Sequence, residues 1–158
     1  ELENRQTAMS YEVYSGCGAF ANTKVQAPKM TTTPPSNHVR IKRAYASVEP
    51  DDGARILIDR LWPRGIKKEA LALTSWNKEL APSAELRKWF GHEPARWEEF
   101  RRRYIAELRE HADQVHALSR RAVDGVVTIV YGARDEEHNN AVVMRELLLD
   151  PSALDPSR

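Results

Sequence analysis

Short runs of apolar residues predict three strands along the chain. Apolar and basic residues alternate in Val39–Ala46, and Arg55–Asp59 is a compact apolar run. The turn-forming residues 49–53 separate these two runs, so we expect the two strands to pair in antiparallel fashion across the turn. The run Val126–Tyr131 is unbroken and mostly β-branched. It predicts a strand that is buried on both faces.

Apolar residues at steps of three or four predict one long helix from Pro94 to about Arg121. Pro94 suits the first helical position, where the missing N–H is not needed. Trp97 and Tyr104 lie on the single apolar face, so we expect both of them in the core.

Shorter helical patterns flank this long helix. Between Lys67 and Gly91 the pattern is helical in pieces, and Ser83 suits the N-cap of a helix over 84–90. A last helix is predicted over about Glu136–Leu149, and Asp135 is a natural N-cap for it.

The order of these elements predicts an α/β fold, with a small central sheet, a right-handed helical crossover and helices packed on the sheet. We expect residues 38–150 to form a single α/β domain. Residues 1–37 are rich in Ser, Thr, Asn and Pro, which indicates a disordered extension or a leader added by cloning. Residues 151–158 are expected to be a flexible C-terminal tail.

Composition fits one ordinary globular domain. The chain has 158 residues, of which 41% are hydrophobic and 30% charged. Lys plus Arg total 24 against 23 for Asp plus Glu, which counts against a general nucleic-acid binder. The basic run Arg101–Arg103 has Glu98, Glu99 and Glu107 close by on the helix, so it is interpreted as a solvated face.

Cys17 is the one cysteine, so neither a disulfide framework nor a structural zinc site is indicated. No apolar run approaches the roughly 18 residues that a membrane span needs. We therefore expect a cytoplasmic protein with no membrane association, no metal site and no cofactor.

Two polar segments follow predicted strands and carry the candidate chemistry. They are 59–65 (DRLWPRG) and 131–139 (YGARDEEHN). If the two strands are parallel, both segments leave the same carboxyl edge of the sheet, where open α/β sheets bind ligands. Arg60, Arg64 and Arg134 are then expected to converge near the positive end of the last helix and form an anion site. The full set of candidate ligand-binding residues is Asp59, Arg60, Trp62, Arg64, Trp89, His92, Tyr131, Arg134, Asp135, His138 and Asn139.

Structural interpretations of the same residues stay open. Asp135 can be a helix cap with no role in ligand binding, Arg60 can pair with a carboxylate at the core edge, and Trp62 can be a packing residue. His92 can close a helix end. Asp59, Asp135 and His138 could also hold a metal or act as acid and base, but Asp-x-x-His on one helical turn is a weak signal.

Three ordered motifs make the chain resemble a known family. Residues 59–65, 86–92 (LRKWFGH) and 135–139 (DEEHN) are similar to those of the YeaO-like family of small bacterial proteins of unknown function (domain of unknown function 488). The resemblance covers about residues 39–149. It implies a compact bacterial cytoplasmic α/β domain and brings no established activity or catalytic residue.

The chain departs from the family pattern at three positions. Glu93 stands where Asp is usual before the proline, Arg134 where Lys is common, and Gly132 where Ala is usual. The first change weakens a helix cap, and the second keeps the positive charge.

Two hypotheses about function follow. The first is a domain, with or without enzymatic activity, that binds a small phosphate- or carboxylate-bearing ligand at the strand ends. The second is a non-catalytic interaction module for nucleic acid or protein.

Overall fold

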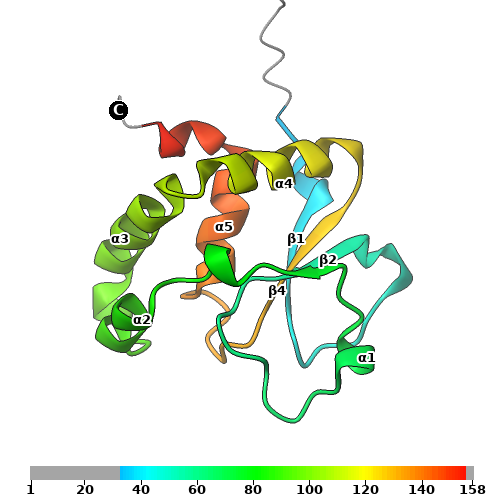
Figure 1. The fold of residues 1–158 in the computed structure, drawn as a ribbon, viewed down its shortest axis with the longest axis horizontal. Coiled ribbons are helices and arrows are strands. Elements are labelled where there is room, and N and C mark those ends of the chain that lie inside the picture. Colours follow the sequence, from blue (N-terminus) through cyan, green and yellow to red (C-terminus); the bar gives the residue numbers. More distant parts are fainter. Residues whose placement is uncertain (1–32, 156–158) are drawn as a thin grey trace, which may run out of the picture. The chain divides into compact units, whose positions relative to one another are not determined.

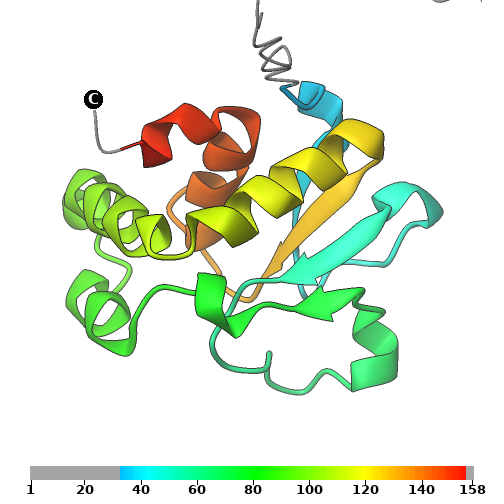
Figure 2. The same ribbon diagram turned by 45° about the horizontal axis from the view of Figure 1, so that its top comes forward.

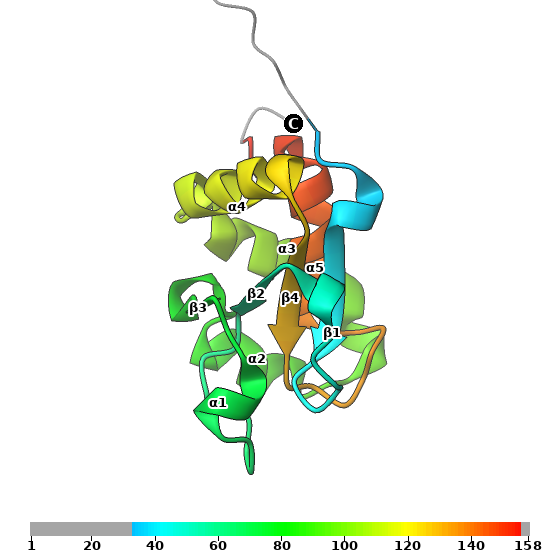
Figure 3. The same cartoon turned by 90° about the vertical axis from the view of Figure 1, so that its right-hand side faces the viewer.

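A four-stranded parallel sheet forms the centre of the part of the chain that the computed structural model describes, residues 33–155. Its strands are β1 (Val39–Arg43), β2 (Ala54–Leu57), β3 (Ser75–Trp76) and β4 (Val127–Tyr131). They lie in the order β1-β4-β2-β3, and every neighbouring pair is parallel. Figure 3 shows β4 between β1 and β2. The α/β fold expected from the order of elements is confirmed.

Five α-helices surround this sheet (Figure 1). Helices α4 and α5 contact β4, and α5 also contacts β1. The segment that holds α1 packs on the opposite face, through Leu71 and its neighbours. The α-helices are α1 (Lys68–Leu71), α2 (Ala84–Phe90), α3 (Trp97–Arg109), α4 (Ala112–Asp124) and α5 (Asn140–Leu149), and the 3-10 helices are η1 (Ser36–His38), η2 (Pro50–Asp52), η3 (Lys78–Leu80), η4 (Pro94–Arg96) and η5 (Pro151–Leu154).

The prediction that the first two strands form an antiparallel hairpin is wrong. β1 and β2 do not touch as neighbours, because β4 lies between them and pairs with both in parallel. Every residue of β4 is buried, so this strand needs a partner on each side and takes a central position. The turn-rich stretch forms η2, which carries the chain back to start β2 in the same direction as β1.

The prediction of a single long helix from Pro94 to Arg121 is also wrong, because the chain bends at Glu110 and His111 between α3 and α4. The two helices meet at an angle in Figure 2. An unbroken helix over these 28 residues would be about 42 Å long, far longer than a five-residue strand of about 17 Å. The bend lets α4 pack on β4 while α3 packs on α2.

The last helix starts later than predicted. α5 begins at Asn140, and its N-cap is Asn139, whose side-chain oxygen accepts hydrogen bonds from the N–H groups of Ala141 and Val142. The interpretation of Asp135 as the N-cap is therefore wrong. Asp135 instead accepts hydrogen bonds from the backbone N–H groups two and three residues later, within the preceding turn.

The fold continues beyond residue 150. The expected flexible tail begins with η5, and Leu154 of this helix is buried in the core. Of the expected extension over residues 1–37, residues 1–32 lie outside the described part, as does Cys17, and Pro34 is buried. No helix among the described residues is both long and apolar enough to cross a membrane.

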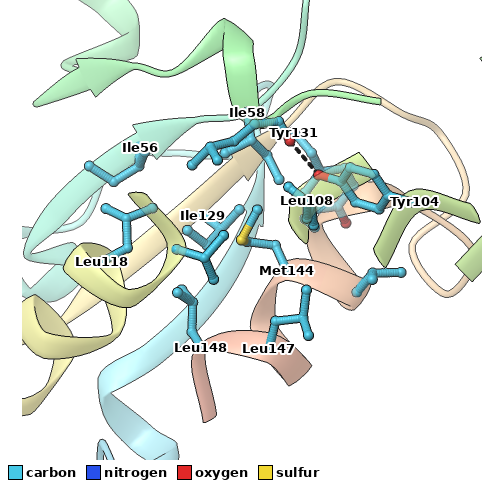
Figure 4. Packing of buried hydrophobic residues seen from close by; sticks show 14 of the residues in the cluster. Ile56, Ile58, Tyr104, Leu108, Leu118, Ile129, Tyr131, Met144, Leu147 and Leu148 are labelled. Atoms are coloured by element: carbon cyan, nitrogen blue, oxygen red, sulfur yellow. Dashed lines mark hydrogen bonds between the residues drawn. The ribbon is translucent and has the colours of Figure 1, made fainter. Parts of the chain in front are cut away.

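The main core fills the space between the sheet and helices α3, α4 and α5 (Figure 4). Ile56, Ile58 and Ile129 face these helices, whereas Leu57 and Val130 point to the other face and join a smaller core. Tyr104 is fully buried and donates a hydrogen bond from its hydroxyl to the carbonyl of Leu80, so its assignment to the core is confirmed. Trp97 is only partly buried at the margin of the core, so its assignment holds in part.

Candidate functional site

A cavity of 440 Å³ opens where β2 and β4 end. The segments that follow these strands form two of its walls, and α2 with the start of α5 forms the others. The parallel strands thus bring the 59–65 segment and the 131–139 segment to one edge, as expected. Six of the candidate residues line this cavity: Asp59, Arg60, Trp62, Arg64, His92 and Asn139.

Asp59 lies two residues after the end of β2, and two neighbouring segments hold its side chain in place. Its Oδ2 accepts a hydrogen bond of 2.6 Å from the backbone N–H of Gly132, and its Oδ1 accepts one of 3.2 Å from Asn140 Nδ2. A Cβ atom at residue 132 would lie 2.9 Å from Asp59 Oδ2, so glycine lets the carboxylate approach the backbone this closely.

Burial raises the pKa of the Asp59 carboxyl above its usual range. The hydrogen bonds from Asn140 and Gly132 oppose this shift, and so do the positive charges of Arg87 and His92. No Lys, Arg or His nitrogen of the described residues lies within ion-pair distance of Asp59. Desolvation therefore dominates the electrostatics of this carboxyl group.

Arg87 of α2 is a cavity residue that the sequence did not reveal. Its Nε is buried and has no hydrogen-bond partner, and its side chain forms no hydrogen bond or ion pair with any other described residue. The other two arginines with a buried unpaired nitrogen, Arg55 and Arg101, both hold carboxylates. One signal was available: Arg87 precedes Phe90 by three positions, so both lie on the same helical face.

Arg60 and Arg64 stand at the mouth of the cavity on the exposed loop after β2. Neither guanidinium group forms a hydrogen bond or ion pair with another described residue, so the alternative that Arg60 pairs with a carboxylate at the core edge is not seen. The backbone of the loop is fixed by Trp62, whose Nε1 donates a 2.7 Å hydrogen bond to the carbonyl of Ile66. Trp62 also packs edge-on against Trp76, so it combines a packing role with its place at the cavity.

The end of α2 shapes the opposite wall. Gly91 and His92 both adopt left-handed backbone conformations, with φ of 53° and 58°. A non-glycine residue with positive φ is uncommon, and such residues gather at functional sites. This turn brings His92 to the cavity, where its ring lies 5.6 Å from that of Phe90.

The start of α5 completes the site. Asn139 and Asn140 both line the cavity, and Asn140 Nδ2 also donates a hydrogen bond of 3.1 Å to the carbonyl of Ile58. Since Asn139 already caps the N–H groups of Ala141 and Val142, the helix adds to the site mainly through its dipole.

The remaining candidates lie outside this cavity. Tyr131 is buried in the core, and Trp89 stacks against the guanidinium groups of Arg96 and Arg103.

Arg134 is exposed and does not line the cavity, so the expected convergence of three arginines holds for Arg60 and Arg64 alone. The third arginine that lines the cavity is Arg87.

Asp135 and His138 form a pair of their own beside the cavity. His138 Nδ1 lies 3.0 Å from Asp135 Oδ2, and the imidazole packs edge-on against Trp97. The backbone hydrogen bond from His138 holds the pKa of Asp135 below its usual range. No group of three or more His, Cys, Asp or Glu side chains that could hold a metal occurs within residues 33–155.

The charged groups of the cavity are predominantly cationic. Among residues 33–155, three guanidinium groups and one carboxylate line it, which gives a formal charge of +2 when His92 is counted as neutral. Phe90, Phe100 and two prolines supply apolar wall between these groups. Such a mixture of apolar surface with a few converging polar groups is typical of small-molecule sites.

Comparison with known proteins identifies relatives that the chain spans almost completely. It is 44% identical over 111 residues to "Uncharacterized protein YeaO" of Escherichia coli (strain K12), which covers 70% of this chain and 96% of the relative. It is 42% identical over 110 residues to "Uncharacterized protein Rv3073c" of Mycobacterium tuberculosis (strain ATCC 25618 / H37Rv) and to "Uncharacterized protein Mb3100c" of Mycobacterium bovis (strain ATCC BAA-935 / AF2122/97), over 70% of this chain and 92% of each relative.

No solved structure matches the chain. A family model matches residues 38–156, which include the whole sheet and every wall of the cavity. Its description is "Inactive DUF488-N3 subclade". The resemblance drawn from the three motifs is thereby confirmed, and the chain belongs to this YeaO-like DUF488 family.

Proposed function

We propose that this domain binds a small anionic ligand, bearing a phosphate or carboxylate group, in the cavity at the carboxyl edge of the sheet, and that it does so without catalysing a reaction. The observation that carries the proposal is the state of Arg87. Arg87 lines the cavity, and its guanidinium group, including the buried Nε, has no hydrogen-bond or ion-pair partner among the described residues.

A buried donor without a partner costs about 1–3 kcal/mol, and more when the group is charged. Buried polar groups in native proteins are therefore nearly always hydrogen-bonded, and an exception calls for an explanation. The two Nη groups of Arg87 form no hydrogen bond or ion pair with a described residue either, so an anion in the cavity can bind the guanidinium group through them. The guanidinium group suits this role because its planar fork matches the oxygens of phosphate and carboxylate.

Arg60 and Arg64 support the same proposal from the mouth of the cavity. Both are exposed and have no carboxylate partner among the described residues, so their charges stay available to attract an anion. The cavity volume of 440 Å³ falls within the range of about 300–1,000 Å³ that is usual for small-molecule sites.

Binding without chemistry agrees with the description of the family as an inactive subclade. The pair of Asp135 and His138, which could have acted as acid and base, lies outside the cavity lining. We place this binding function in the cytoplasm, on the basis of the cysteine-poor sequence and the bacterial relatives.

The alternative of a nucleic-acid- or protein-binding module has less support. The basic run that would serve it, Arg101–Arg103, lies on α3. Arg101 forms an ion pair with Glu146, and Arg102 and Arg103 both form ion pairs with Glu99. These ion pairs reduce the positive charge that a phosphate backbone would meet. Tight binding of nucleic acid that weakens steeply with added salt would favour this alternative.

Calorimetric titration with inorganic phosphate and with acetate tests the proposal. Replacing Arg87 with Gln removes the charge and the fork, so we expect the affinity for these anions to fall about tenfold or more. Arg121→Gln is the matched control, because Arg121 is exposed on α4 and lies outside the cavity. Equal losses in the two variants, or no binding by the unaltered protein, would rule out the proposed site.

A further inference from the structure

We infer that Asp59 narrows the ligand to one chemical class: anionic molecules that carry a hydroxyl or amine hydrogen-bond donor beside the anionic group. The inference rests on the proposed function, since it takes Arg87 as the partner of the anionic group. It adds a second contact, made by Asp59, which is the one carboxylate among the described residues that line the cavity.

The carboxylate has acceptor capacity left for such a contact. A carboxylate offers about four lone-pair positions. The described residues occupy two of them, through the N–H of Gly132 and the amide of Asn140. Both of these donors come from the 131–140 side, while Asp59 also lines the open cavity.

Desolvation of the Asp59 carboxylate makes a hydrogen bond from a ligand to its free acceptor positions more favourable. Asp59 is partly buried and has no ion pair with a described residue, and burial raises its pKa. A ligand donor would replace hydration that the carboxylate has lost. An anion without a donor would instead bring a second negative charge towards Asp59 with nothing to offset it.

Two-point recognition follows from the placement of Asp59 and Arg87. Both line the same cavity, and the charge of Arg87 lowers the pKa of Asp59, yet the two groups are not within ion-pair distance. A molecule that lies between them can meet the guanidinium with its anionic end and the carboxylate with its donor. Phe90 and Phe100 of the wall suit a short carbon segment that joins these two groups.

Hydroxy acids, amino acids and hydroxyl-bearing phosphate esters share this chemistry. Matched pairs of probes separate them from plain anions. Lactate and alanine are compared with propionate, and glycerol 3-phosphate is compared with propyl phosphate. Comparing the affinities of the carboxylate probes with those of the phosphate probes then shows which anionic group Arg87 prefers.

The decisive experiment is calorimetric titration of the full chain with these probes. We expect the donor-bearing member of at least one pair to bind about tenfold more tightly than its plain partner. In Asp59→Asn that preference should fall to less than about twofold, while the plain anion binds as well or better because a negative charge is gone. The melting temperature of the variant verifies that it folds.

A second variant guards against misfolding of the first. The exchange Asp59→Asn with Asn140→Asp keeps one carboxylate and one amide in contact but moves the charge away from residue 59. We expect this variant to lose the preference as well.

Two outcomes would overturn the inference. Equal affinity within every pair, at every pH tested, does so while leaving the proposed function standing. If none of the probes and no inorganic phosphate binds the unaltered protein, the proposed function fails and this inference fails with it.

Discussion

At the scale of single residues, the carboxyl group of Asp59 links the cavity to the stability of the fold. Burial raises its pKa from the ordinary value of 3.8, so the folded state favours the protonated form more than the unfolded chain does. The stability that this group contributes is therefore fully present below pH 3.8 and is lost as the pH rises through the folded-state pKa.

Denaturation with urea over a pH series tests this linkage. Asp59→Asn removes the titrating group. The free energy of unfolding of this variant, minus that of the unaltered protein, should therefore increase as the pH rises above about 3.8. Taking the difference between the two proteins cancels the other carboxylates, several of which have lowered pKa values. A difference that shrinks with rising pH would mean that the pKa of Asp59 is lowered in the folded state.

At the scale of elements, the entry into β2 depends on one glycine. Gly53 has a φ of 62°, and a Cβ atom there would lie 2.1 Å from the carbonyl oxygen of Val126. This close approach sets β2 beside β4, where Ala54 N–H donates a hydrogen bond of 2.9 Å to the same oxygen. The register of the parallel pair therefore leaves no room for a side chain at residue 53.

Replacing Gly53 with Ala should lower the free energy of unfolding by about 3 kcal/mol or more, since backbone strain and a steric clash add together. Gly125→Ala is the matched control. Gly125 has an extended φ of −175°, and nothing lies within 4 Å of a Cβ atom built there, so its cost should stay within about 0.5 kcal/mol. Similar costs for the two variants, measured by urea denaturation, would contradict this account of the β2 register.

The same scale shows where sequence patterns reach their limit. The β-branched run of β4 predicted a fully buried strand, because both of its faces are apolar. Nothing local in β1 and β2 shows that β4 will separate them, since this depends on pairing with a strand some 70 residues later. The bend at Glu110 and His111 was equally hidden, because the apolar period continues through it and only the size of the sheet requires it.

At the scale of the whole molecule, topology decides which candidates meet. Asp59, Arg60 and Arg64 were predicted because they follow a strand, and parallel pairing brings them to the segment after β4. Arg87 was missed because a charged residue on a helix usually faces water. Its role depends on α2 lying across the carboxyl edge, which is a long-range arrangement that no local pattern encodes.

The central claim is that Arg87 receives an anion in this cavity. Nuclear magnetic resonance follows it directly, through the Nε–H signal of Arg87 and the backbone N–H signals of Gly132 and Asn140 as inorganic phosphate is added. We predict that these three signals shift together and saturate with one dissociation constant, while the signals of the exposed Arg121 stay in place. Small shifts spread over exposed arginines, with no saturation and none at Arg87, would contradict the account.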